Sequence, residues 1–198
     1  MEIVYQLMMG LSLAACAGFR ATLPMLIMAV MARTGHIQLN SSLQFLSGDT
    51  ALTVLAIASV IEFLGDKIIG FDHVLDVIGT VARPIAGMLL TSAMLTKIDP
   101  FTAMALGLVV GGGTAFTMHA GKAVVRAKST VLAGFHGGLG NAALSVGEDA
   151  VSGTGSVLSV FFPIFTFFCA IVMMGAAVGM VILGFYAGKK LLQNAPVQ

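Results

Sequence analysis

Apolar segments long enough to cross a lipid bilayer dominate this chain. Only 10% of its 198 residues carry charge, 58% are hydrophobic, and the mean hydropathy is +0.99. A water-soluble domain of this size would not tolerate so apolar a surface. The sequence therefore predicts an all-α integral membrane protein with a single membrane domain over residues 1–198.

Six transmembrane spans are expected, and two of them contain a break. The spans cover residues 3–31, 51–64, 81–95, 101–125, 131–146 and 157–187. The first is too long for one straight crossing and is interrupted at residues 18–24, where Pro24 lacks a backbone N–H donor. We expect two half-helices there, meeting near mid-membrane. Three glycines, residues 111–113, predict a corresponding break in the fourth span.

Seven residues near the N-terminus recur, ungapped, 95 positions later. They are Met9, Leu11, Leu13, Gly18, Thr22, Val30 and Ala32, which recur as Met104, Leu106, Leu108, Gly113, Thr117, Val125 and Ala127. The repeats are about residues 1–98 and 99–198. Because each half holds an odd number of expected spans, the second is predicted to be an upside-down copy of the first. Such 3+3 inverted repeats are familiar from carriers and exchangers.

The distribution of basic residues predicts the orientation. If both termini are cytoplasmic, the inner side holds Lys67, Arg83, Lys122, Arg126, Lys128, Lys189 and Lys190, and the outer side holds only Arg33 and Lys97. This bias predicts a multi-pass protein of the bacterial cytoplasmic (inner) membrane with both termini cytoplasmic. The basic residues form short clusters rather than one patch, so no nucleic-acid partner is expected.

Ionisable side chains at membrane depth are the first functional candidates, because each is costly unless paired or hydrated. Arg20 lies at the expected break, where a half-helix N-terminus adds partial positive charge. It is interpreted as an anion site, as the counter-charge of a buried carboxylate, or as a structural residue bonded to carbonyls that the break leaves free.

Acidic pairs are the second group of candidates. Glu62 and Asp66 are four residues apart and share a helix face, which suits a hard cation or a shared proton. Glu148 and Asp149 lie at the corresponding end of the fifth span. These four carboxylates are the expected ligands of a metal ion; the alternative is that they are solvated caps at the membrane interface.

Polar residues of the fourth and fifth spans complete the predicted pathway. A histidine at depth relays protons or packs in a hydrogen bond, and glycines around the polar groups allow a hydrated seam. The predicted pathway residues are Arg20, Thr22, Glu62, Asp66, Thr117, His119, His136, Asn141, Ser145, Glu148 and Asp149.

Four motifs together resemble a known family. They are Gly18-Phe19-Arg20-Ala21-Thr22-Leu23-Pro24; Asp66-Lys67 with Asp72; Ala82-Arg83-Pro84-Ile85-Ala86-Gly87; and Gly140-Asn141-Ala142-Ala143-Leu144-Ser145 ahead of Glu148-Asp149. Over nearly the whole chain they resemble the uncharacterised bacterial membrane family called domain of unknown function 4126. The resemblance implies no activity.

A more distant similarity concerns the residues from Glu62 to Lys67. They are similar to the Glu-x-Gly-Asp-Lys-Ser/Thr signature that small two-repeat calcium or manganese proton exchangers carry twice. Here one extra residue separates Glu62 from Gly65, Ile68 replaces the hydroxyl residue, and the second copy has Glu148 directly after Gly147.

The sequence favours a small secondary transporter or exchanger for a small ion, with proton coupling through Arg20 or the histidines. One alternative is a carrier for an anionic solute or lipid headgroup that uses Arg20. Another is a membrane scaffold without flux, whose glycine-lined faces pack against a partner or in a homodimer. No cofactor and no enzymatic role are expected, because no nucleophile has a base to orient it.

Overall fold

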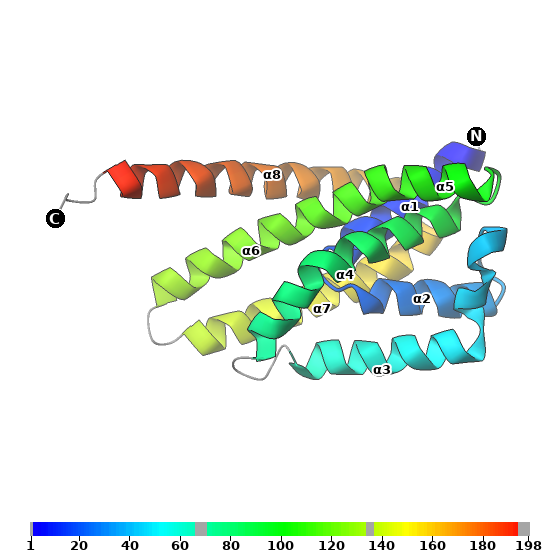
Figure 1. Ribbon diagram of the computed structural model, residues 1–198, viewed down its shortest axis with the longest axis horizontal. Coiled ribbons are helices and arrows are strands. Elements are labelled where there is room, and N and C mark those ends of the chain that lie inside the picture. Colours follow the sequence, from blue (N-terminus) through cyan, green and yellow to red (C-terminus); the bar gives the residue numbers. More distant parts are fainter. Residues whose placement is uncertain (1, 66–70, 134–136, 194–198) are drawn as a thin grey trace.

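The protein is a bundle of helices, and the computed structural model describes residues 2–65, 71–133 and 137–193. Within them the helices are α1 (Glu2–Ala17), α2 (Thr22–Arg33), α3 (Asp49–Gly65), α4 (Phe71–Met94), α5 (Pro100–Leu106), α6 (Gly113–Ala133), α7 (Gly137–Phe161) and α8 (Pro163–Gln193). A 3-10 helix, η1 (Ser41–Ser47), precedes α3, and a π-helix, η2 (Gly107–Gly112), joins α5 to α6. In Figure 1 α8 and α3 form opposite edges, with α1, α4 and α7 between them.

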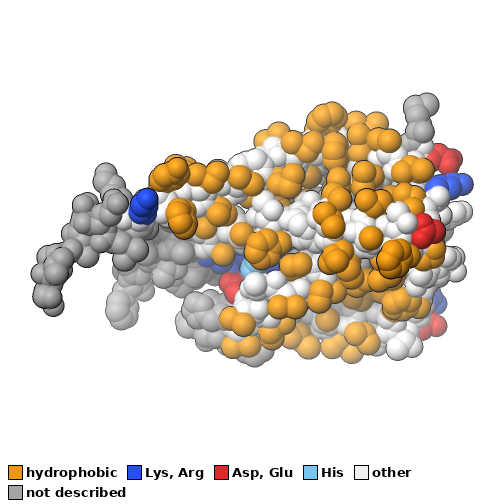
Figure 2. Space-filling view, turned by 45° about the horizontal axis from the view of Figure 1, so that its top comes forward, with side chains coloured by type: hydrophobic (Ala, Val, Ile, Leu, Met, Phe, Trp, Pro, Cys, Tyr) orange, Lys and Arg blue, Asp and Glu red, His pale blue; other side chains and the backbone are white. Residues whose placement is uncertain are grey.

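Three segments of the described chain are long and apolar enough to cross a membrane: Val74–Met94, Pro100–Arg126 and Pro163–Tyr186. A fourth is counted if η1 and α3, bent by 64°, form one span, and α1 and α2 are shorter apolar helices. Hydrophobic side chains spread over most of the face seen in Figure 2. The all-helical, apolar architecture is therefore as predicted for a membrane protein, but six spans are not reproduced.

The chain reverses between α1 and α2 instead of continuing across the bundle. At the start of α1, Glu2 lies 3.6 Å from Lys97 and the Gln6 Nε2 donates to Thr96 Oγ1. After α2, Asn40 Nδ2 donates to the carbonyl of Leu95 at 2.7 Å. Both ends of this helical hairpin thus meet the turn between α4 and α5. The predicted break into two helices is confirmed, but the two helices return to the same end of the bundle instead of forming one span.

The described helices do not confirm that the second half of the chain is an upside-down copy of the first. Gly10 of α1 and Gly111 of η2 both pack against Thr91 of α4. Farther along each segment, Gly18 packs against Ala115 and Met118. Helix α1 and the η2–α6 segment therefore advance in the same direction, whereas an inverted repeat would have them run in opposite directions. The reason is the hairpin: because α1 and α2 return to their starting end, the second half begins where the first one does.

The glycines at residues 111–113 do not break the chain. The helix stays continuous through η2, whose wider π turn is a common local adjustment inside long helices. Glycine is required here by close packing, since a Cβ atom on Gly111 would lie 2.7 Å from the Thr91 Cβ, and one on Gly107 would lie 2.6 Å from the Met88 carbonyl oxygen. The small residues bring two helices together, as in other membrane bundles.

Two further boundaries differ from those expected. Helix α4 begins at Phe71 rather than at residue 81, so Pro84 lies in its interior. Helix α7 continues through the small residues that lie between the fifth and sixth expected spans and ends at Phe161. These residues face α1: the Ser152 Oγ donates to the carbonyl of Cys16 at 3.2 Å. Glycine and serine mark a packing surface here rather than a loop.

The tight contact between η2 and α4 predicts different effects of two neighbouring substitutions. Gly111→Ala should lower the free energy of unfolding by about 1–3 kcal/mol, because the added methyl overlaps Thr91. Gly113→Ala is the matched control, because no atom lies within 4 Å of its added Cβ. Thermal melts in detergent followed by far-UV circular dichroism compare the two; equal melting temperatures would disprove the packing assignment.

Candidate functional site

Arg20 lies in the reversal between α1 and α2 and is only 1% exposed. Its Nη1 donates to the carbonyl of Glu62 at 3.0 Å, and its Nη2 donates to the Ser145 Oγ at 2.9 Å. Its Nε lies 2.7 Å from the Oδ1 of Asp149. The guanidinium thereby connects the reversal to α3 and to α7. The Asp149 carboxylate balances its positive charge, as the burial of an arginine requires.

The carboxylate of Glu62 caps the first turn of α2. It accepts hydrogen bonds from the backbone N–H groups of Ala21 and Thr22, at 3.0 and 3.1 Å, and from the Thr22 hydroxyl at 2.6 Å. Helix α2 has no cap from its own N-cap residue, Ala21. Glu62 therefore satisfies N–H groups that a helix start leaves unpaired, and its negative charge faces the positive end of the helix dipole.

A second group of charges surrounds Glu148 on α7. Its Oε2 lies 2.8 Å from the Lys122 Nζ and 2.8 Å from the Arg126 Nη2. The Nζ of Lys122 also donates to the carbonyl of Phe19 at 3.2 Å. This last bond connects α6 to the reversal. The charges around Glu148 and those around Arg20 therefore contact consecutive residues, Phe19 and Arg20.

Asp76 and Arg83 of α4 extend this second group. Asp76 Oδ2 accepts from Arg126 Nη1 at 3.0 Å, and Asp76 Oδ1 lies 3.3 Å from Arg83 Nη2. The Nη1 of Arg83 donates to the Nδ1 of His119. That bond leaves the proton of a neutral His119 on Nε2, which faces the Thr80 hydroxyl at 3.2 Å.

We call these two groups the Arg20 cluster and the Glu148 cluster, and together the charge network. The Arg20 cluster comprises Arg20, Thr22, Glu62, Ser145 and Asp149, and the Glu148 cluster comprises Asp76, Thr80, Arg83, His119, Lys122, Arg126 and Glu148. Four basic and four acidic side chains are thus gathered in the described part of the chain. With His119 neutral their formal charges cancel, which reduces the cost of burying them.

Helix α7 separates two cavities beside the network. One, of about 340 Å³, is lined by Arg20, Glu62 and Asp149 together with apolar side chains of α2 and α3. The other, of about 210 Å³, is lined by Lys122, Arg126 and Glu148 with apolar residues of α6 and α8. The consecutive residues Glu148 and Asp149 therefore face different cavities and different cations. Such paired acids and bases offer sites for proton transfer or for exchange of ion-pair partners.

The structure assembles part of the predicted pathway. Arg20, Thr22, Glu62, Ser145 and Asp149 come together, whereas Glu148 and His119 belong to the other cluster. Thr117 donates to the carbonyl of Gly113 within its own helix. Asp66 and His136 lie outside the described residues, as does the side chain of Asn141.

The predicted metal ligands are not gathered into one site. Glu62 binds the start of α2, Asp149 pairs with Arg20, and Glu148 pairs with Lys122 and Arg126. Across the described ranges no group of three or more His, Cys, Asp or Glu side chains is placed to hold a metal ion. Asp66, the fourth expected ligand, lies beyond those ranges.

Four charged residues of the Glu148 cluster were missed by the sequence analysis. Arg83, Lys122 and Arg126 were assigned to the inner membrane face, but Arg83 is 1% and Lys122 is 6% exposed. The spacing of these residues along the sequence indicates that they share helix faces. Asp76, Thr80 and Arg83 follow positions i, i+4 and i+7, and His119, Lys122 and Arg126 follow i, i+3 and i+7. Each set occupies one helix face, and two such faces indicate a polar contact between helices.

The fold and the network together define a class of protein, a bundle of apolar helices with a charge-balanced network of buried and half-buried ionisable side chains beside a helix reversal. Within this class the chain belongs to the family described as domain of unknown function (DUF4126), whose model matches residues 7–182. A search of curated proteins and a search of solved structures each found no match. The comparisons do not show the more distant similarity to two-repeat exchangers.

Pairing within the Glu148 cluster predicts strongly non-additive mutations. Glu148→Gln should destabilise the protein by about 3–5 kcal/mol, because Lys122 and Arg126 then lose a carboxylate in an apolar environment. Lys122→Met in the same chain should recover part of that loss, since it removes one unmatched charge. Unfolding free energies of the two single variants and the double variant form the test; strictly additive effects would refute the pairing.

Proposed function

We propose that this protein is a small membrane transporter that moves an ion, most simply a cation exchanged for protons, through the region of the charge network. The observation that supports this proposal is a set of paired ionisable side chains between apolar helices, four basic and four acidic, of which Arg20, Arg83, Lys122 and Glu148 are buried and the other four half-buried. Charges at such positions are costly and are typical of ion pathways and proton relays. A helix interrupted beside them is a common feature of transporter binding sites.

The proposed mechanism depends on exchange of partners rather than on symmetry between the two halves. Glu62 holds the start of α2, and protonation of its carboxylate would weaken three hydrogen bonds at the reversal. Asp149 follows Glu148 on α7, so a shift of that helix changes both clusters together. We propose that proton binding to Glu62 or Asp149 and cation binding in the adjacent cavity of about 340 Å³ exclude each other.

The anion-carrier alternative has less support. Arg20 already contacts the Glu62 carbonyl, Ser145 and Asp149, and the Glu62 carboxylate occupies the N-terminal end of α2. An incoming anion would have to displace these groups. A scaffold would give no ion flux in liposomes.

We place the protein in the bacterial cytoplasmic membrane with the long axis of Figure 1 across the bilayer. In that arrangement the α1–α2 hairpin enters and leaves on one side. The start of α1 and the end of α8 lie at opposite ends of the bundle in Figure 1, so they would face opposite sides. This differs from the sequence-based expectation that both termini are cytoplasmic, and the difference follows from the hairpin.

Transport assays in liposomes test the proposed function. Vesicles that contain a pH-sensitive dye should report proton movement when a gradient of at least one of K⁺, Na⁺, Ca²⁺ or Mn²⁺ is applied. Glu62→Gln and Asp149→Asn should each reduce this flux to that of protein-free vesicles. Asp49→Asn is the control, because the Asp49 carboxylate is 87% exposed and pairs only with Arg33 among the described contacts.

Two results would contradict the proposal. One is the absence of flux above background for every gradient, which would favour the scaffold alternative. The other is a flux that persists unchanged in both the Glu62→Gln and the Asp149→Asn proteins. Far-UV circular dichroism and the melting temperature of each variant show whether a loss of flux reflects loss of fold.

A further inference from the structure

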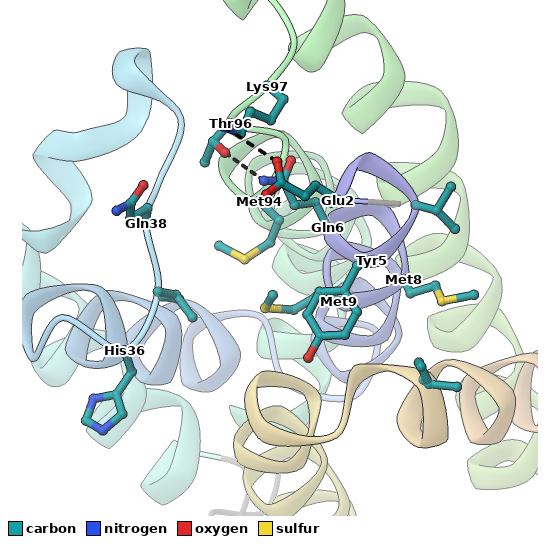
Figure 3. A pocket seen from close by; sticks show the side chains of 13 residues that line it. Glu2, Tyr5, Gln6, Met8, Met9, His36, Gln38, Met94, Thr96 and Lys97 are labelled. Carbon is teal, nitrogen blue, oxygen red and sulfur yellow. Dashed lines mark hydrogen bonds and ion pairs between the residues drawn. The ribbon is translucent and has the colours of Figure 1, made fainter.

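A large cavity lies away from the charge network, where α1 begins. It has a volume of about 790 Å³, is open to the surface, and is lined by the first turns of α1, residues 36–38, the turn after α4 and the start of α8 (Figure 3). None of the charged residues of the network lines it. Any ligand of this cavity is therefore separate from the proposed ion pathway.

The cavity lies at the level where the candidate spans end. Met94, which lines it, is the last residue of one candidate span, and Lys97 lies in the turn before the next span starts at Pro100. Ile164, also in the lining, is the second residue of the third candidate span. Ends of all three candidate spans therefore lie at this cavity. If these helices cross a bilayer, the cavity lies at the level of the lipid headgroups.

The walls of the cavity are amphipathic. Its apolar part includes Met8, Met9 and Met94, whose flexible side chains adapt to irregular apolar ligands. Figure 3 shows Glu2, Gln6, Thr96 and Lys97 grouped at one end, with the methionines below them. An apolar cavity with a few polar groups at one end is the usual form of a ligand site, and here the ligand must be amphipathic too.

The polar end offers acceptors for a hydrogen-bond donor. The Gln6 Nε2 donates to Thr96 Oγ1 at 2.7 Å, while the Gln6 Oε1 is buried without a hydrogen-bond partner in the structure. Such an atom is costly unless a ligand or water supplies a donor. Beside it, the Glu2 carboxylate is 77% exposed and lies 3.6 Å from the Lys97 ammonium, a weak pair that a ligand can replace.

We propose that this cavity binds a phospholipid with a primary-amine headgroup, of the phosphatidylethanolamine type. Its ammonium donates to the Gln6 Oε1 and the Glu2 carboxylate, its phosphate faces Lys97, and an acyl chain covers Met8, Met9 and Met94. A choline headgroup has no N–H to donate, and a glycerol headgroup has no cation for Glu2. The primary amine is thus the feature that the site selects.

Native mass spectrometry of the intact chain tests this inference. The detergent-purified protein is incubated with equal amounts of phosphatidylethanolamine, phosphatidylcholine and phosphatidylglycerol that carry identical acyl chains. We expect about tenfold tighter retention of phosphatidylethanolamine than of phosphatidylcholine, the ratio that about 1.4 kcal/mol of net hydrogen bonding gives. Gln6→Leu and Glu2→Gln should each reduce this preference, and together they should abolish it.

A matched control is available at the same end of the bundle. Arg33 and Asp49 form an exposed ion pair with 2.6 Å between Nη1 and Oδ1, and neither lines the cavity. Arg33→Gln with Asp49→Asn should leave the lipid preference unchanged. Equal retention of the three lipids by the unmodified protein, or an unchanged preference in the Gln6→Leu and Glu2→Gln double variant, would overturn the inference. The assay needs no ion gradient, so its outcome is independent of the transport assay.

Discussion

Burial of Arg20 at a helix reversal is the interaction on which the rest of the structure depends. A guanidinium among apolar helices needs partners for its charge and its N–H groups, and a helix that starts inside the bundle needs acceptors for its own N–H groups. Glu62 and Asp149 supply both needs from two other helices. The hairpin of α1 and α2 is therefore stabilised by carboxylates that α3 and α7 contribute. Without these two helices the charge of Arg20 and the N–H groups at the start of α2 would lack these partners.

Helix α7 connects the two clusters of the network. Consecutive carboxylates of α7 reach opposite cavities, Asp149 toward Arg20 and Glu148 toward Lys122 and Arg126. The bond from Lys122 to the Phe19 carbonyl returns to the reversal from the other side. The two clusters thus share one helix and one backbone segment, and the proposed coupling of proton and cation would act through these shared elements.

The helical class, the break after α1 and the part of the site around Arg20 could be predicted from the sequence. Hydropathy gives the apolar helices, and the cost of a buried arginine identifies Arg20 together with the need for a counter-charge. The direction of the chain after the break could not be predicted. It is decided by contacts distant in sequence, such as the bond from Asn40 to the Leu95 carbonyl, and these leave no periodic signal in the sequence.

The Glu148 cluster was missed for a different physical reason. Basic residues near the ends of apolar segments are usually interfacial, so Lys122 and Arg126 were counted as flanking charges although helix α6 continues past them. Similarly, Ser152 and Gly155 fell between two expected spans, whereas in an apolar bundle small residues allow close contact between helices. Both errors come from considering one segment at a time, and helix-face spacing across two segments would have corrected the first.

The most direct test of the central claim is side-specific labelling of single cysteines in vesicles, in a chain that carries Cys16→Ala and Cys169→Ala. If α1 and α2 form a hairpin around Arg20, a membrane-impermeant thiol reagent should reach Glu2→Cys and Gln44→Cys from the same side. Lys189→Cys, near the C-terminal end of α8, should react from the other side, because that end of α8 lies opposite the start of α1 in Figure 1. Labelling of Glu2→Cys and Gln44→Cys from opposite sides would mean that α1 and α2 cross the membrane in sequence, and the account of the reversal would be wrong.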